Sequence, residues 1–163
     1  MRHFPDAMFA IAVAFATLPA WAAPPADGVP SAAAKARAHF SVRFYVMQWD
    51  APDRFDYRYE GGELTLHAQH FGPADAEKAD LEIRVRASAP GRHAIPGAAH
   101  ATYEVLGCKH AIGSGSYVEL TRIEPTRIEG RFELHGHCAP APASSQAMRD
   151  GRFTLVFDDA RRR

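Results

Sequence analysis

The sequence has no excess of either charge and no catalytic signature, and it contains only two cysteines. Nineteen basic residues balance nineteen acidic ones among 163 residues. Because a neutral chain has no bulk attraction for phosphate backbones or anionic lipids, we expect no nucleic-acid partner. There is no Gly-x-Ser-x-Gly nucleophile elbow, and no glycine-rich phosphate-binding loop precedes a helix. The sequence therefore predicts no catalytic residue and no bound nucleotide.

Long apolar runs are also missing, except for one at the N-terminus. Residues 7–18 are mostly apolar, follow the basic Arg2 and His3, and precede a small-x-small triplet at residues 20–22 (AWA). This order is typical of a cleaved export signal, whereas a bilayer span needs about twenty apolar residues. We therefore expect a signal peptide over residues 1–22, a periplasmic or secreted protein, and no membrane span after cleavage. A retained membrane anchor is the alternative.

Composition divides the remaining chain into three parts. Residues 23–37 are rich in Ala and Pro and are expected to form a linker. Residues 38–158 are enough to bury one core and form the predicted domain. Residues 159–163 end in three arginines and are expected to be a solvated basic tail. The only helical candidate is the short stretch 73–79, as one turn or a loop.

Hydrophobic alternation with a period of two runs through most of the predicted domain. In one example, Leu81, Ile83 and Val85 alternate with charged residues, and similar runs begin near residues 40, 64, 128 and 153. Short turn signals rich in Gly and Pro separate these runs, and Asp-Gly at 150–151 is one of them. The pattern predicts an all-β fold: an antiparallel β-sandwich of eight or nine strands, with a small β-barrel as the alternative.

The two cysteines, Cys108 and Cys138, are expected to form a disulfide, because an exported protein folds in an oxidising compartment. His110, His135 and His137 lie close to them in the sequence. Thiolate and imidazole groups bind zinc or copper, so a Cu or Zn site is the alternative, with or without the cysteines. Alternation places Cys138 with the apolar residues and His135 and His137 with the polar ones. Since one strand does not direct these three side chains at a single ion, we favour the disulfide and no cofactor.

Four aromatic residues, Trp49, Phe55, Tyr57 and Tyr59, cluster around a predicted hairpin. If exposed, their rings would form a surface for a ligand or a partner protein. If they face inward, they belong to the core. We favour the core, because aromatic residues are common in sandwich strands.

Residues 127–134 (RIEGRFEL) and 150–157 (DGRFTLVF) are two alternating strands separated by a polar loop. A Pro-Gly turn at 90–91 and a strand at 116–120 precede them. In these features the C-terminal half resembles small exported bacterial β-sandwich domains of unknown function. The resemblance implies a β-sandwich and transfers no functional residue.

These observations predict an exported, non-enzymatic binding or interaction module of a bacterial envelope. Its expected partner is another envelope protein or a small ligand, and the sequence does not indicate an oligomeric state. A periplasmic metal-binding protein that uses the histidines is one alternative. The other is a hydrolase whose site is not visible in the sequence, since Ser114 and Ser116 fit a turn better than a nucleophile.

Overall fold

The computed structural model describes residues 29–44, 47–71, 78–105, 107–138 and 145–158. These residues form one short helix, α1 (Ala32–Lys35), and eleven strands that pair only in the antiparallel sense. The strands are β1 (His39–Phe44), β2 (Met47–Trp49), β3 (Arg54–Glu60), β4 (Glu63–His70), β5 (Ala79–Arg86), β6 (Gly91–Ile95), β7 (Ala99–Val105), β8 (Cys108–Ile112), β9 (Ser116–Glu124), β10 (Arg127–Cys138) and β11 (Ser145–Val156). The predicted antiparallel all-β class is confirmed.

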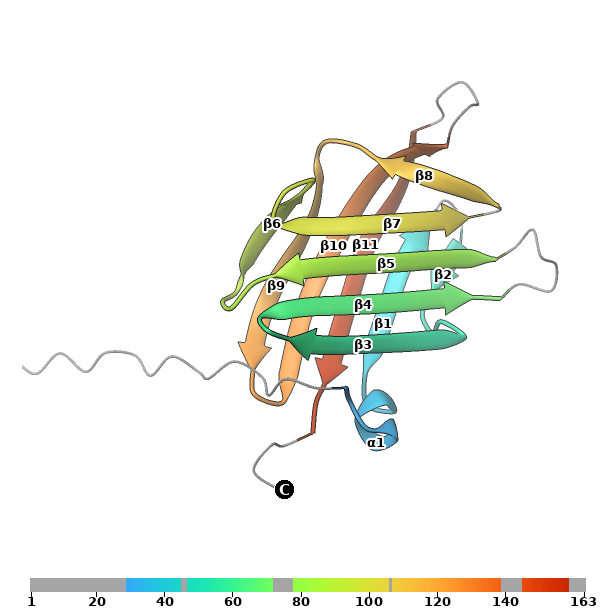
Figure 1. Ribbon diagram of the computed structural model, residues 1–163. Coiled ribbons are helices and arrows are strands. Elements are labelled where there is room, and N and C mark those ends of the chain that lie inside the picture. The colour runs from blue at the N-terminus through green and yellow to red at the C-terminus, as the bar shows by residue number, and fades with distance from the viewer. Residues whose placement is uncertain (1–28, 45–46, 72–77, 106, 139–144, 159–163) are drawn as a thin grey trace, which may run out of the picture.

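Nine strands follow one continuous path, in the order β2-β1-β11-β10-β8-β7-β5-β4-β3. This path curls into an open half-barrel, so that β3, β4, β5 and β7 cross in front of β1, β10 and β11 (Figure 1). We call these two layers the front arm and the rear arm. Strand β10 pairs with β9 over Arg127 to Glu133 and with β8 over Gly136 to Cys138. Strand β8 therefore joins the two arms within one continuous sheet, which is an open half-barrel.

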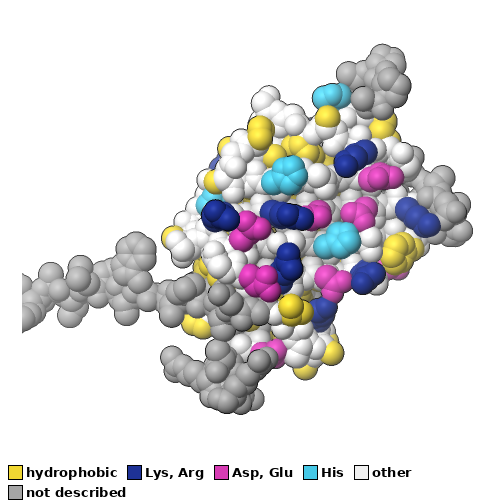
Figure 2. Space-filling view, viewed as in Figure 1, with side chains coloured by type: hydrophobic (Ala, Val, Ile, Leu, Met, Phe, Trp, Pro, Cys, Tyr) yellow, Lys and Arg dark blue, Asp and Glu magenta, His cyan; other side chains and the backbone are white. Residues whose placement is uncertain are grey.

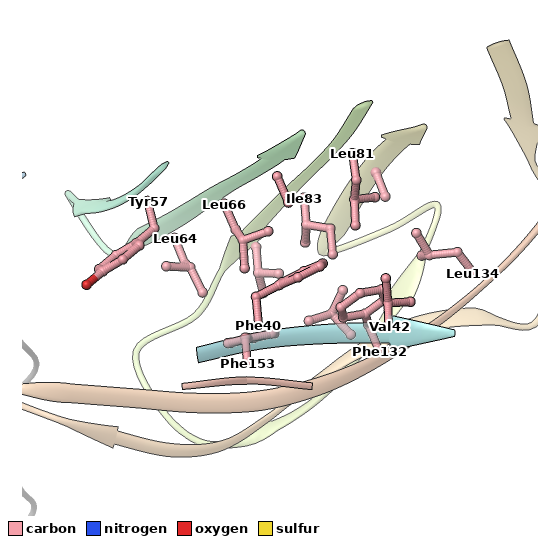
Figure 3. Close-up of a cluster of buried hydrophobic side chains, with 14 of the residues drawn as sticks. Phe40, Val42, Tyr57, Leu64, Leu66, Leu81, Ile83, Phe132, Leu134 and Phe153 are labelled. Carbon is pink, nitrogen blue, oxygen red and sulfur yellow. The ribbon is translucent and has the colours of Figure 1, made fainter. Parts of the chain in front are cut away.

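Apolar side chains from both arms fill the space between them. Figure 3 shows side chains of β4 and β5 that point toward those of β1, β10 and β11 across the interior. The Phe40 ring links the arms, because its centroid lies 5.3 Å from that of Phe55 in β3 and 5.9 Å from that of Phe132 in β10. Each large apolar side chain buried in this way contributes about 1.5–3 kcal/mol. The described interior is thus a packed core, so ligands are expected on the outer faces.

The predicted inward positions are correct on the long strands, but the structure has more strands than predicted. Leu81, Ile83 and Val85 are all buried in β5, as their alternation indicated. Strands β2, β6 and β8 have only three to five residues, which is too short for a period of two to stand out. The turn predicted at residues 150–151 is wrong: these residues lie inside β11, where the register shifts. Of the helical candidate 73–79, residues 73–77 lie outside the described residues, Lys78 lies in no helix or strand, and Ala79 begins β5.

Helix α1 attaches the end of the Ala/Pro-rich segment to the sheet. Ser31 caps the helix, because the Ala34 backbone N–H donates to the Ser31 hydroxyl oxygen at 3.2 Å. The same hydroxyl donates to the Asp158 carboxylate at 2.8 Å, just beyond the end of β11. Ala34 is buried, and Lys35 forms an ion pair with Asp56 of β3. No helix in the described part of the chain is long and apolar enough to cross a bilayer.

Candidate functional site

The predicted disulfide is confirmed. Cys108 in β8 and Cys138 in β10 are joined, with their Cα atoms 5.9 Å apart. The bond lies at the junction of the two arms, where β8 pairs with the last residues of β10. A disulfide is typical of a protein that folds outside the reducing cytoplasm.

The structure does not bring together the three histidines considered as metal ligands. His110 is buried, its ring stacks on that of Tyr103 with centroids 4.4 Å apart, and its Nδ1 lies 2.9 Å from the Cys108 carbonyl oxygen. His135 and His137 alternate with buried residues of β10 and so lie on its outer face. Within the described residues, no three His, Cys, Asp or Glu side chains are grouped so that they could hold a metal ion.

The aromatic residues near the first hairpin lie in the core. Trp49, Tyr57 and Tyr59 are buried, and Phe55 is half-buried against Phe40. The Tyr57 hydroxyl donates to the Val156 carbonyl oxygen at 2.7 Å and so links the two arms. Burial raises the pKa of Tyr57, because the charged phenolate is disfavoured there. Trp49, Tyr57 and Tyr59 therefore lie in the core, as favoured, and do not form the alternative exposed surface for a ligand or partner.

The serines considered in the hydrolase alternative lie in the turn before β9 and at the first residue of that strand. Ser116 is buried, and its hydroxyl donates to the Gly113 carbonyl oxygen and accepts from the His135 backbone N–H, both at 2.9 Å. These bonds hold the start of β9 against β10. Ser114 is exposed in the turn itself. These hydrogen bonds give Ser116 a structural role, so its presence needs no role as a nucleophile.

The outer face of the front arm carries a hollow of about 310 Å³, which we call the front hollow. Its polar lining comes from four strands and includes Gln69 of β4, Asp80 of β5, Thr102 and Glu104 of β7, and Lys109 of β8. Phe71, directly after β4, also lines it and is 50% exposed, whereas most large apolar side chains of the described part are buried. An exposed aromatic ring beside groups that form hydrogen bonds is a common feature of ligand sites.

Strand register aligns the polar groups of the front hollow in one row. Gln69 lies opposite Asp80, Asp80 opposite Glu104, and Glu104 opposite Lys109. Two acidic residues directly opposite each other destabilise a sheet. The positive charge of Lys109, opposite Glu104, reduces the repulsion between Asp80 and Glu104. Figure 2 shows this face, on which basic and acidic side chains alternate around exposed histidines.

Two neighbours hold the Asp80 carboxylate in place. The Gln69 side-chain amide donates to it at 2.6 Å, and the His67 Nε2 lies 3.0 Å from the same oxygen. Each carboxylate oxygen has more than one lone pair, so Asp80 retains acceptor capacity for a ligand. The row can therefore offer an oriented acceptor from Asp80, a further acceptor from Glu104 and a donor from Lys109 to a polar molecule in contact with Phe71.

A smaller hollow of about 190 Å³ lies beside β3, between Val29 and the ion pair of Lys35 with Asp56. The Lys35 ammonium group beside Asp56 lowers the pKa of that carboxyl. The front hollow is larger than this one and is lined by the exposed ring of Phe71. We therefore regard the front hollow as the better candidate site.

The sequence did not indicate the front hollow. Alternation tells which side chains face outward, but the row across β4, β5, β7 and β8 depends on the register between strands that are distant in the sequence. The exposed Phe71 was the one local signal, and a single aromatic residue after a strand does not distinguish a site from the core.

In comparisons with known proteins, no family model, curated protein or solved structure matches this chain.

Proposed function

We propose that this chain is an exported, non-enzymatic binding module of a bacterial envelope, and that it binds an oligosaccharide in the front hollow. The observation that supports this proposal is the exposed Phe71 ring beside the row of Gln69, Asp80, Glu104 and Lys109. A sugar ring has an apolar C–H face that packs on an aromatic ring, and hydroxyls that bond with amides and carboxylates. The N-terminal signal pattern and the disulfide favour a periplasmic or secreted location.

Binding fits this site better than catalysis. The Asp80 carboxylate has fixed partners in Gln69 and His67, which suits a group that recognises a hydroxyl in one orientation. Gln69, His67 and Asp80 lie on paired strands of the front arm and contact one another. Little conformational entropy of these side chains is therefore lost when a ligand binds, which favours affinity.

An oligosaccharide array probed with the mature chain, followed by calorimetric titration of the glycan that binds best, tests the proposal. We expect Phe71→Ala to weaken binding at least about tenfold, which corresponds to about 1.4 kcal/mol of lost stacking. Val29→Ala is the matched control, because it removes another exposed large apolar side chain, one that lines the smaller hollow. The proposal fails if no glycan on the array binds, or if Phe71→Ala binds as tightly as the Val29→Ala control.

A further inference from the structure

Five arginines face outward on the rear arm, on the side of the molecule away from the front hollow, and four of them lie opposite one another in two pairs. We call Arg43, Arg131, Arg149 and Arg152 the arginine cluster. Arg43 lies directly opposite Arg149 across β1 and β11, and Arg131 lies directly opposite Arg152 across β10 and β11. Like charges that face each other across neighbouring strands destabilise a sheet. The chain as a whole has equal numbers of basic and acidic residues, so two such pairs of arginines are a local excess of positive charge. An anionic partner would relieve the repulsion between these arginines.

A β-bulge places two of these arginines on the same face of one strand. Residues three apart on a regular strand point to opposite faces. At Asp150 the backbone has a φ of 54°, and the register of β11 shifts against both neighbouring strands. As a result Met148 and Gly151 are buried, while Arg149 and Arg152 are both exposed. Bulges commonly redirect side chains in this way, and this one doubles the number of arginines that β11 presents.

The acidic residues of the described chain compensate only half of the cluster. Arg131 donates to the Glu119 carboxylate from Nε at 3.0 Å and from Nη2 at 2.9 Å, and Arg43 pairs with Asp150. No carboxylate among the described residues forms an ion pair with Arg149 or Arg152. Two positive charges are therefore uncompensated there.

The spacing of the cluster suits phosphate groups. Neighbouring strands lie about 4.8 Å apart and alternate residues about 7 Å apart, so the four Cα atoms occupy an area of about 10 by 7 Å. The planar guanidinium group of Arg binds phosphate oxygens through two parallel hydrogen bonds. Four such groups on a sheet surface can contact several phosphates that lie in one layer.

We infer that the arginine cluster docks this protein on the phosphate layer of an anionic membrane surface. A stable protein partner would bury apolar side chains at the centre of the interface. The large apolar side chains exposed in the described part, Val29 and Phe71, line the two hollows and not the cluster. Lipid headgroups need no such apolar centre. Because the core separates the two arms, docking through the rear arm leaves the front hollow open to its ligand, so this inference does not depend on the proposed glycan binding.

Co-sedimentation of the mature chain with phosphatidylglycerol vesicles tests the inference, with phosphatidylcholine vesicles as the uncharged comparison. We expect binding only to phosphatidylglycerol, and we expect high salt to abolish it. The double variant Arg149→Gln/Arg152→Gln should bind about 30-fold more weakly, because each arginine near an anionic surface contributes about fivefold. The matched control, Arg58→Gln/Arg84→Gln, removes two exposed arginines from the front arm and should leave binding unchanged.

Three results would overturn the inference. The first is equal vesicle binding by the double variant and the control variant. The second is loss of binding when the three terminal arginines, residues 161–163, are replaced by glutamine in the full chain, since the tail would then be the anchor. The third is tighter binding to poly-glutamate than to the vesicles, which would identify an acidic protein as the partner of the cluster.

Discussion

At the scale of single residues, Gly151 shows how closely the rear arm is packed. A Cβ atom at this position would lie 2.5 Å from ring atoms of Phe132, a buried side chain of the core. We expect Gly151→Ala to lower the free energy of unfolding by about 1–3 kcal/mol, because the ring or the backbone must move. Urea unfolding measures this change. Gly91→Ala is the control, since its Cβ would meet only the His93 Nε2, at 3.9 Å; equal losses in the two variants would contradict the packing argument.

Tyr103 makes a prediction about alkaline pH. Burial raises the pKa of Tyr103 from 10.0 to about 12. Since the folded chain favours the neutral phenol, this contribution to stability is complete below pH 10 and is lost as the pH rises through about 12. The free energy of unfolding should therefore fall by up to about 2 kcal/mol over this range. Urea unfolding at several pH values should show a smaller fall for Tyr103→Phe, in which Tyr57, whose pKa burial also raises, still contributes; an unchanged fall would show that Tyr103 is not responsible.

At the scale of elements, the sequence predicted the strands that are long enough to alternate. The inward faces of β5 and β10 follow from their apolar residues, and the disulfide was predicted from the presence of only two cysteines in a chain expected to be exported. The pairing of distant strands did not follow, because local periodicity contains no information on register or strand order. For this reason the junction through β8, the row in the front hollow and the outward turn of Arg149 at the bulge were all missed.

Helix α1 gives a prediction at the same scale, because Ser31 both caps the helix and bonds to Asp158. We expect Ser31→Ala to cost about 1 kcal/mol through loss of the cap and to weaken the attachment of α1 to the end of β11, where only the backbone N–H of residue 31 would still donate to the Asp158 carboxylate, at 2.9 Å. Hydrogen exchange of the backbone amides in residues 34–38 should become faster, while exchange in β4 and β5 stays slow. Ser114→Ala, at an exposed turn, is the control. If both variants exchange alike, Ser31 does not hold the helix.

At the scale of the whole molecule, the disulfide ties the two arms together. Cys108 and Cys138 are 30 residues apart in sequence and connect β8 with β10 at the junction of the sheet. Replacing both cysteines by Ala should lower the free energy of unfolding by roughly 2–5 kcal/mol, since the unfolded chain gains freedom. Thermal unfolding with and without reductant measures the same effect on the unchanged chain. Equal melting temperatures would show that the bond adds nothing to the stability of the fold.

A glycan bound in the front hollow should contact its lining and leave the outer face of the rear arm unchanged. Backbone ¹H–¹⁵N spectra of the mature chain, recorded during titration with the oligosaccharide selected on the array, test this expectation most directly. We predict that the amide signals of Gln69, Phe71 and Thr102 shift as the glycan saturates the chain, while those of Arg149 and Arg152 stay in place. Shifts confined to β11 and β1, or no shift at saturating glycan, would contradict the assignment of the front hollow as the binding site.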